Sequence, residues 1–543
     1  MASSLGAESS SSQDAHLGHR EFDLKLTDRV KMSMVGVPES HFDFWAAKFL
    51  AKGYRVGRVA QSENKIGAEI RMKDGKSAGA SKTKSKGKAA GGDEDKIVQR
   101  ELKTVLTTGT LVDAELLSDD QASHCVAIKE YTPSTSSSPV FGVCAVDAAT
   151  AEFSLSSFED DISRTGVETL MRQLKPKELL HEKGNLSAAT VRLLRNTLSL
   201  DCQWTALKPE KEFLTADAAR VEIRHMFAAH DGGGAMDVDG DESAGATLPE
   251  AIRQVYDKPV AMSALGGMIW YLRQLNLDNE LATARNFNIY DPISRGRALN
   301  LDGQSLAHME VLQNSHGGTE GTLLQLFSRC VTPFGKRLFK IWLCSPLRDA
   351  ADINARLDAV EDLIATPAFE ERFDKTMRGV PDLERLISRV HAKTCKKADF
   401  LKVMASFERV GKALAYLKEL ASDFTSASMR QLLEGAPDTT EMRDAIQELY
   451  DGDEMLPVEG KDDEFEVVRG NVEQVEAKLQ AALSKYKKEL GSRDLTFKDI
   501  GTKDIFMVQV PVKVKTPSNW IKMSGTKDFN RCVSHARRVL VRH

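Results

Sequence analysis

The spacing of hydrophobic residues changes twice along this chain. Phe42, Trp45 and Phe49 recur at helical spacing before Gly53, and an extended segment begins at Val56, so this part predicts a helix followed by a strand. From residue 124 onward, short runs rich in β-branched and aromatic residues alternate with helical patterns. The expected strands cover 124–131, 139–150, 151–158 and 178–181, and the expected helices cover 167–174 and 187–198. This alternation predicts an α/β domain.

From Leu248 nearly every apolar pattern is helical. The first clear stripe consists of Leu265, Met268, Ile269, Leu272 and Leu275. Further helical patterns lie at 320–344, 350–364, 382–391, 398–420 and 439–450. The longest covers 464–490, with apolar residues about every 3.5 positions, and would be ~40 Å long. A helix of that length indicates an arm or lever.

Extended segments return after this long helix. Residues 495–501, 504–514 and 519–525 have strand character, with β-branched and aromatic residues between Gly and Pro. From Gly491 to Arg531 eight Lys and Arg accompany four Asp, so the local charge is +4 in a chain whose net charge is −5. A basic β element at the end of an arm fits a phosphate backbone. The alternative is the solvated face of an ordinary β element.

Three stretches lack a hydrophobic pattern. Residues 73–96 consist of Gly, Ser, Ala and charged residues and predict a disordered insertion. Its lysines fit either a solvated loop or a basic segment for nuclear import or DNA tethering. Residues 230–247 are rich in acid and Gly and predict a linker, and residues 1–13 predict a loose tail.

Length and composition narrow the class of protein. A chain of 543 residues is too long for one core and predicts several domains. Seven widely spaced Cys without a C-x-x-C pair indicate reduced thiols and no zinc knuckle. The N-terminus lacks the basic and apolar regions of a secretory signal, and no apolar run reaches ~18 residues, so we expect no membrane span.

Catalytic motifs are absent from the sequence. The segment most similar to a phosphate loop, Gly67…Gly75-Lys76-Ser77, has seven residues between its glycines where the motif needs four. No H-E-x-x-H or G-x-S-x-G occurs. Asp147 ends an apolar strand, which fits the first carboxylate of a metal-dependent nuclease or an ordinary turn residue. We therefore expect neither an enzyme nor a bound cofactor.

Four stretches resemble the MutS family of DNA mismatch-repair proteins, in family order. Residues 18–61 with 110–117 resemble its first domain, 141–161 its connector, 299–363 its core and 506–531 its clamp. The most specific match is Thr332-Pro333-Phe334-Gly335-Lys336-Arg337-Leu338 followed by Trp342-Leu343. The details are most similar to the eukaryotic, mismatch-reading (GT-binding) subunits of that family.

The resemblance implies a multidomain α+β fold. It places a small mixed α/β mismatch-recognition domain at 14–118, an RNase H-like α/β connector at 119–229, the linker at 230–247, a mostly α-helical core and lever at 248–463, the lever helix with a small β clamp at its tip at 464–531, and a divergent tail at 532–543.

The resemblance also implies a function. Family members bind double-stranded DNA as dimers, and in eukaryotes we expect a heterodimer with a second MutS homologue in the nucleus. The first domain wedges an aromatic residue into the minor groove and the clamp grips the backbone. The candidate DNA-binding residues are Lys515, Lys522, Ser524, Thr526, Lys527 and Arg531 in the clamp, and Lys31 and Met34 in the first domain.

Three departures from the family pattern change this expectation. The family reader, Phe-x-Glu, would fall at positions 7 and 9, which are Ala7 and Ser9 here. The family match stops after Arg531, and the ATPase domain, which uses ATP and Mg in the full-length family, has no counterpart. We therefore expect a truncated chain that grips DNA with little preference for a mispair. The alternative is a non-catalytic interaction fragment that binds repair partners without recognising mismatches.

Overall fold

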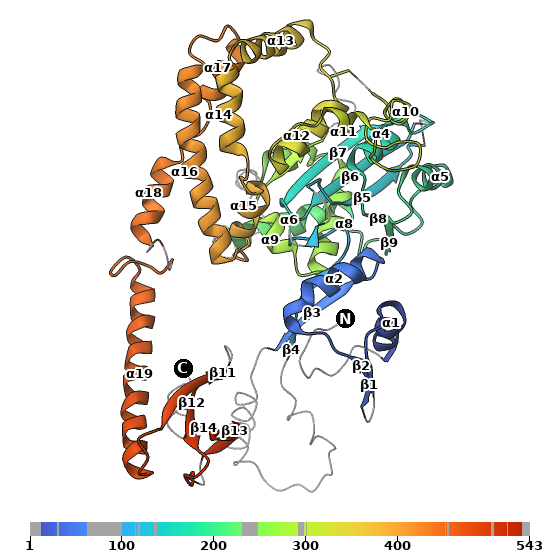
Figure 1. The fold of residues 1–543 in the computed structure, drawn as a ribbon. Helices are drawn as coiled ribbons and strands as arrows, with labels where there is room; N and C mark the ends of the chain where they lie inside the picture. Colours follow the sequence, from blue (N-terminus) through green and yellow to red (C-terminus); the bar gives the residue numbers. More distant parts are fainter. Residues whose placement is uncertain are drawn as a thin grey trace. The chain divides into compact units, whose positions relative to one another are not determined.

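The structure is a computed structural model. It describes residues 12–29, 32–61, 100–113, 116–117, 120–134, 138–230, 248–290, 298–299, 301–450, 452, 455–500, 504–517 and 520–534. The chain forms two compact units, one made of residues 1–62 and 99–439 and the other of residues 63–98 and 440–543 (Figure 1). The expected insertion at 73–96, almost all of the 230–247 linker and most of the 532–543 tail lie outside the described residues.

The first unit begins with small helices and hairpins. Its elements are α1 (Ser12–Phe22), β1 (Leu26–Arg29), β2 (Met32–Val35), η1 (Glu39–His41), α2 (Phe42–Ala51), β3 (Val56–Gln61) and β4 (Arg100–Leu106). β1 pairs with β2, and β3 pairs with β4, both antiparallel. The predicted helix-then-strand segment is confirmed, and Gly53 ends α2 with a φ of 81°. α1 was not predicted, and its start at Ser12 overlaps the expected loose tail.

A six-stranded sheet forms the centre of the first unit, in the order β10-β7-β6-β5-β8-β9. The strands are β5 (His124–Tyr131), β6 (Val140–Asp147), β7 (Glu152–Glu159), β8 (Glu178–Glu182), β9 (Gln203–Leu207) and β10 (Phe287–Ile289). β5, β6 and β7 are antiparallel neighbours, whereas β8 and β9 continue the sheet parallel to β5. The predicted α/β alternation is confirmed, but β9 and β10 were not predicted.

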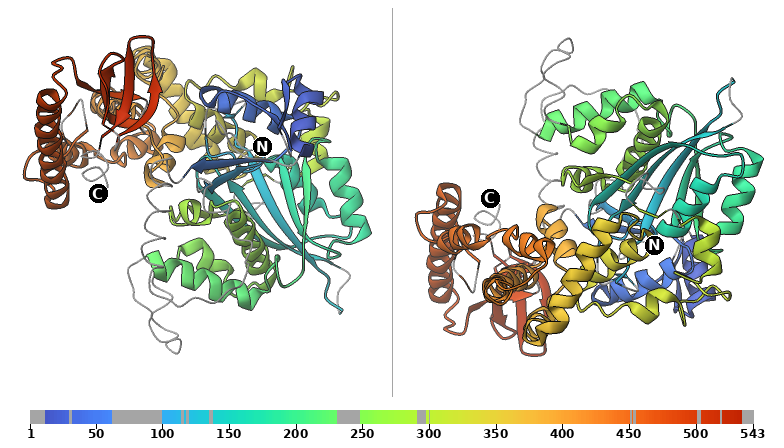
Figure 2. Two further views of the ribbon diagram at one scale, coloured as in Figure 1. Left: turned by 90° about the horizontal axis from the view of Figure 1, so that it is seen from below. Right: turned by 90° about the horizontal axis from the view of Figure 1, so that it is seen from above.

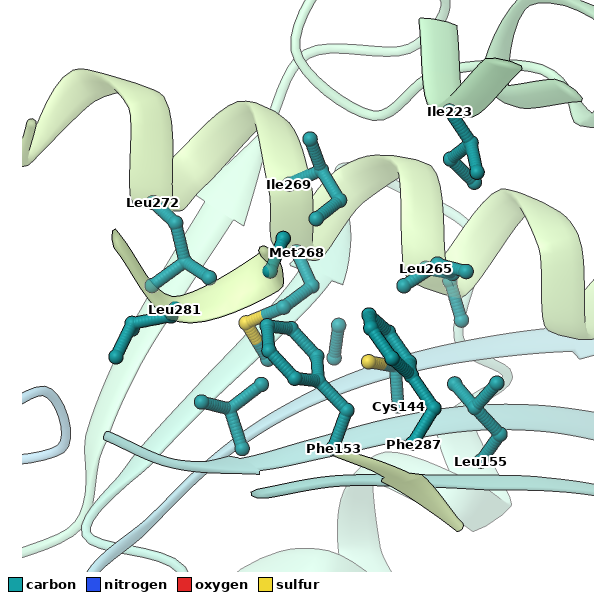
Figure 3. Close-up of a cluster of buried hydrophobic side chains, with 14 of the residues drawn as sticks. Cys144, Phe153, Leu155, Ile223, Leu265, Met268, Ile269, Leu272, Leu281 and Phe287 are labelled. Atoms are coloured by element: carbon teal, nitrogen blue, oxygen red, sulfur yellow. The ribbon is translucent and has the colours of Figure 1, made fainter. Parts of the chain in front are cut away.

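Helices cover both faces of this sheet (Figure 2). α4 (Thr165–Leu174) and α5 (Ala188–Thr197) cover one face, and α6 (Ala216–His230), α7 (Glu250–Val255) and α8 (Pro259–Gln274) cover the other. Burial on both faces explains why the strands are nearly continuous apolar runs. The predicted stripe is buried: Met268 reaches toward Phe153 (Figure 3), and Leu265 and Ile269 belong to the same buried cluster. α7 and α8 were expected in the helical core, yet they pack on this sheet.

The rest of the first unit is helical. Its helices are α9 (Asp278–Ala282), α10 (Gly303–His308), α11 (Leu323–Phe327), α12 (Pro333–Cys344), α13 (Ala350–Ala365), α14 (Pro367–Met377), α15 (Leu383–His391), α16 (Lys397–Leu420) and α17 (Ala427–Glu434). The single helix expected at 320–344 is instead two, because Pro333 starts a new helix and the Thr332 hydroxyl accepts a bond from Gly335 N at 3.2 Å. α9, α10, α14 and α17 were not predicted individually.

The second unit joins a long helix to a small sheet. α18 (Thr440–Leu449) and the 27-residue α19 (Asp463–Glu489) precede β11 (Thr496–Ile500), β12 (Asp504–Pro511), β13 (Ile521–Gly525) and β14 (Phe529–Val533). These strands form an antiparallel sheet in the order β11-β12-β14-β13, called the C-terminal sheet below. Leu483 of α19 packs against its Val508, Val510 and Trp520. The predicted order of helix and β element is confirmed, although β14 was not predicted.

Candidate nucleic-acid interface

The basic end of the C-terminal sheet is built by two neighbouring turns. Residues 526–529 close the β13–β14 hairpin, where Thr526 N donates to Phe529 O at 2.7 Å. Residues 512–515 follow β12, and Val512 N donates to Asp528 O at 3.0 Å, which joins the two turns. Lys515 and Lys527, one on each turn, are both exposed. The fold therefore brings two of the predicted lysines to one end of the sheet.

Lys522 extends toward the same end. It is exposed on β13, and a Cβ on Gly525 would lie 3.4 Å from its Cε. Among the described residues, Lys515, Lys522 and Lys527 make no ion pair with a carboxylate. Unpaired exposed ammonium groups are available to an anion, so these three lysines are the strongest of the predicted contacts.

The other predicted residues of this sheet are engaged or covered. The Thr526 hydroxyl accepts a bond from Phe529 N at 3.2 Å, so it stabilises its own turn. Ser524 faces Arg531 across the β13–β14 ladder, and Ser524 Oγ and Arg531 Nε are buried without a hydrogen-bond partner in the described part of the chain. A phosphate reaches these two atoms only after neighbouring side chains move.

The predicted residues of the first domain lie elsewhere. Met34 is half-buried in β2, opposite Thr27. Lys31, Ala7 and Ser9 lie outside the described residues. The predicted lysines that lie together are therefore those of the C-terminal sheet. Met34 lies in the β1–β2 hairpin of the first unit.

A buried polar joint that the sequence did not predict lies at the start of β8. Glu178 is fully buried and accepts bonds from Tyr271 Oη at 2.5 Å, Thr107 Oγ1 at 2.7 Å and Arg55 Nη2 at 3.3 Å. Burial, followed by the charge of Glu178, raises the pKa of the Tyr271 phenol well above its ordinary value. The joint ties β3 and the residues after β4 to the six-stranded sheet.

Residues 107–121 lie between β4 and β5 and are called the crossover segment below; the structure describes 107–113, 116–117 and 120–121 of them. The first joint holds this segment at Thr107, and a second joint holds it at Asp120. Arg337 of α12 is nearly buried and binds both carboxylate oxygens of Asp382 at 2.7 Å, Glu384 at 2.5 Å and the carbonyl of Asp120 at 3.1 Å. Burial alone would lower the pKa of Arg337, but its bonds to the two carboxylates outweigh burial and raise that pKa. Lys336 Nζ lies 2.5 Å from Asp120 Oδ2.

These contacts explain the most specific motif in the sequence. Lys336 and Arg337 come one turn after the capping residue Thr332, and both reach the crossover segment from the first turns of α12. The only sequence signal for these contacts was a Lys-Arg pair near the start of a helix. Asp120, which both residues contact, lies more than 200 residues earlier in the chain. Sequence spacing alone could not identify them.

Asp147 is the last residue of β6, and its side chain caps the turn that follows. Its Oδ1 accepts a bond from Ala149 N at 3.2 Å, which favours the turn interpretation over a nuclease carboxylate. Across the described ranges, no group of three or more His, Cys, Asp or Glu could hold a metal ion, so we assign no described residue to a metal. Within the same ranges, no helix has the length and apolar character needed to cross a membrane.

Three family models match the chain. They are MutS domain I at residues 11–115, MutS domain II at 123–284 and MutS domain III at 304–494. The domain II match runs through α8, in agreement with the packing of that helix on the six-stranded sheet.

Curated relatives match along almost the whole chain. DNA mismatch repair protein MSH6 of Saccharomyces cerevisiae is 33% identical over 561 residues, which cover 98% of this chain and 42% of the relative. DNA mismatch repair protein Msh6 of Homo sapiens is 28% identical, with 89% of this chain and 39% of the relative covered. The chain therefore spans about two fifths of the length of these relatives. With domains I, II and III matched in order, this chain belongs to the MutS family.

Proposed function

We propose that this chain is a DNA-gripping part of a mismatch-repair subunit, and that the C-terminal sheet is its clamp. The observation that carries the proposal is the group of Lys515, Lys522 and Lys527, exposed and without carboxylate partners among the described residues. Ammonium groups on turns at one end of a sheet suit phosphates and read no base sequence.

We also propose domain limits, which rest on the family resemblance and on how the elements pack. Residues 14–118 form the mismatch-recognition domain, 464–531 form the last lever helix with the clamp, and the helical core and lever end at 463. The connector, begun at 119, reaches β10, because α7, α8 and β10 complete its sheet. Its order of three antiparallel strands followed by two parallel ones supports an RNase H-like connector.

We propose that the protein acts in the nucleus with a second MutS homologue as its partner. The proposal rests on eukaryotic relatives that carry the name DNA mismatch repair protein. ATP hydrolysis, a property of the family, is assigned to none of the described residues. The first domain would contribute little mispair preference, since positions 7 and 9 hold Ala7 and Ser9 in place of the family reader.

Fluorescence anisotropy with a labelled 30-base-pair duplex tests the proposal. The chain should bind with a micromolar dissociation constant that weakens as salt rises, because counterions leave the phosphates. Replacing Lys515, Lys522 and Lys527 with Gln should reduce the slope of log K against log salt by about 2 to 3. The matched control replaces three lysines of α19 (Lys478, Lys485 and Lys488) with Gln and should leave the slope unchanged.

Three outcomes would each contradict part of the proposal. An absence of salt-dependent binding would favour the interaction fragment, which co-purification with the partner homologue would then support. Equal slopes for the clamp variant and the control would place the phosphate contacts elsewhere. The dissociation constant for a duplex with one G·T mispair should lie within a few-fold of that for the matched duplex. A tenfold preference for the mispair would mean that the chain recognises mismatches after all.

A further inference from the structure

Two antiparallel helices of the first unit, α14 and α16, lie side by side (Figure 1). Phe369 of α14 packs against Leu417, Ala421 and Phe424 at and beyond the C-terminal end of α16. Away from this apolar contact the two helices line an open hollow of about 370 Å³. The hollow lies in a different unit from the C-terminal sheet, so it is not part of the interface proposed above.

Charge is unevenly distributed in this hollow, which we call the basic groove. Its charged lining residues are Arg372 and Lys375 of α14 and Arg409, Lys412 and Glu408 of α16. Four cations and one carboxylate leave a charge of +3, within a chain whose net charge is −5. Ordinary helix surfaces mix the two signs about evenly, so a concave surface with an excess of positive charge indicates an anionic partner.

The two arginines of the groove are held in place by other contacts. The guanidinium of Arg372 lies 4.9 Å from the ring centre of Tyr416. Arg409 Nη2 donates to the carbonyl of Lys375 at 3.1 Å and to that of Arg378 at 2.6 Å, at the C-terminal end of α14. Side chains already held in position lose less rotamer entropy when an anion binds.

The two lysines differ in their freedom. Lys412 Nζ lies 2.6 Å from Glu408 Oε1, one helical turn away. Lys375 is exposed and has no carboxylate partner in the part of the chain that the structure describes. The groove therefore offers an unpaired ammonium beside two oriented guanidinium groups, with cations on both walls.

We propose that the basic groove binds phosphate groups of a nucleic-acid backbone, as a second DNA contact independent of the C-terminal sheet. The inference rests on the proposed function. Because the relatives are DNA mismatch repair proteins, the polyanion that we expect in the groove is a DNA backbone. Guanidinium groups also match phosphate oxygens in geometry. An acidic segment of a protein partner is the competing occupant, and the experiment separates the two.

The experiment measures binding of the labelled 30-base-pair duplex across a salt series. The groove variant replaces Lys375 and Lys412 with Gln and leaves both arginines in place. The matched control replaces Lys397 and Lys418, exposed lysines of α16 outside the groove, with Gln. Both variants lose two charges, so a nonspecific effect of net charge is the same in each.

The expected result is a slope of log K against log salt that falls by about 2 in the groove variant and by less than 1 in the control. Affinity at fixed salt should fall on the order of tenfold in the groove variant. Circular dichroism should show equal helix content in both variants, so that a loss of binding is not a loss of fold.

Equal slopes for the groove variant and the control, with the wild-type chain still binding duplex, would overturn the groove proposal and leave the proposed function intact. If the groove variant keeps its duplex affinity but loses binding to labelled poly-glutamate, the occupant is an acidic protein segment and the proposal is wrong. If the wild-type chain does not bind duplex, the proposed function fails, and the groove proposal fails with it.

Discussion

Two junctions in this molecule are held together by opposite chemistry. The crossover segment is fixed in the first unit by buried ions, with Glu178 at one end and Arg337 at the other. The C-terminal sheet is fixed to α19 in the second unit by apolar side chains, with Leu483 against Val508 and Trp520. The first junction orders a connection between domains, and the second orders a β element on an arm.

The difference predicts what each junction contributes. Buried ion pairs add little net stability, because removing two charges from water costs about as much as their attraction gains. They accept few alternative geometries, so they fix how the crossover segment leaves β4 and enters β5. Apolar packing contributes stability directly, at roughly 25 cal/mol per Å² of buried area, and is insensitive to salt.

The largest expected effect is the loss of Arg337. Arg337→Ala removes the cation of Glu384 and the two-bond partner of Asp382, for which only Arg385 at 3.3 Å remains among the described residues, and should cost about 3 kcal/mol of unfolding free energy. Urea denaturation of the full chain measures the cost. The control, Arg378→Ala, removes only an exposed pair with Asp374 and should cost less than about 0.5 kcal/mol. Equal costs for the two variants would show that the ionic junction has no special role.

A similar cost with different character is expected at the apolar junction. Leu483→Ala should destabilise the second unit by about 3 kcal/mol, because a buried side chain leaves a cavity. Hydrogen exchange of β12 and β14 should accelerate, with no change in β5 or β8. Val472→Ala, at an exposed position of the same helix, should change little. Faster exchange spreading to the first unit would contradict the separation of the two junctions.

Acid should weaken the first unit before the second. Burial lowers the pKa of His124, with Lys340 acting in the same direction and Asp147 against it. The unfolded chain therefore binds a proton more readily below about 6.5, the ordinary pKa of the imidazole, and stability falls as the pH drops below it. His124→Gln should flatten that fall in urea-denaturation free energies between pH 7 and 5. An unchanged pH profile would assign the acid sensitivity to other groups.

The apolar junction should respond at the opposite end of the pH scale. Burial raises the pKa of the Cys532 thiol above its ordinary value of 9.0, although Lys522 lowers it slightly. This contribution is complete below about pH 9 and is lost as the pH rises through the raised pKa. Cys532→Ser should remove the alkaline loss from the second unit, as measured by hydrogen exchange of β14. A persisting loss would point to another titrating group.

The smallest expected effect is at Lys336, the neighbour of Arg337. Its bond to Asp120 is half exposed on both sides, so Lys336→Ala should cost at most about 1 kcal/mol, and less in high salt. Urea denaturation at two salt concentrations measures it. A cost that equals that of Arg337→Ala would mean that the two adjacent cations act as one buried group.

A helix or strand was predictable from the sequence where its own residues showed a clear hydrophobic pattern or cap. The long pattern at 464–490 became α19 with nearly the same limits, since its apolar spacing and the Asp462 cap act within the helix. α14 was not predicted because only Phe369 and Thr376 are buried among its eleven residues, which leaves little apolar pattern. β9, β10 and β14 are short, and pairing with distant strands defines them.

The candidate interface was predictable in part for the same reason. Local charge identified a basic segment and the family resemblance singled out Lys515, Lys522 and Lys527 within it, but only the folded sheet shows that Ser524 Oγ and Arg531 Nε are covered. Neither polar joint could be predicted, because the fold brings the partners of Glu178 and Arg337 together from up to 217 residues away in sequence. The basic groove likewise combines residues of two helices.

Hydrogen exchange of the whole chain, with and without a saturating 30-base-pair duplex, is the decisive test of whether the C-terminal sheet grips DNA. The account predicts slower exchange on DNA binding in residues 512–517 and in the 526–529 turn, where Lys515 and Lys527 lie. It predicts no change in β9, a strand outside both proposed contacts. Unchanged exchange in both turns, with duplex demonstrably bound, would contradict the claim that the C-terminal sheet grips DNA.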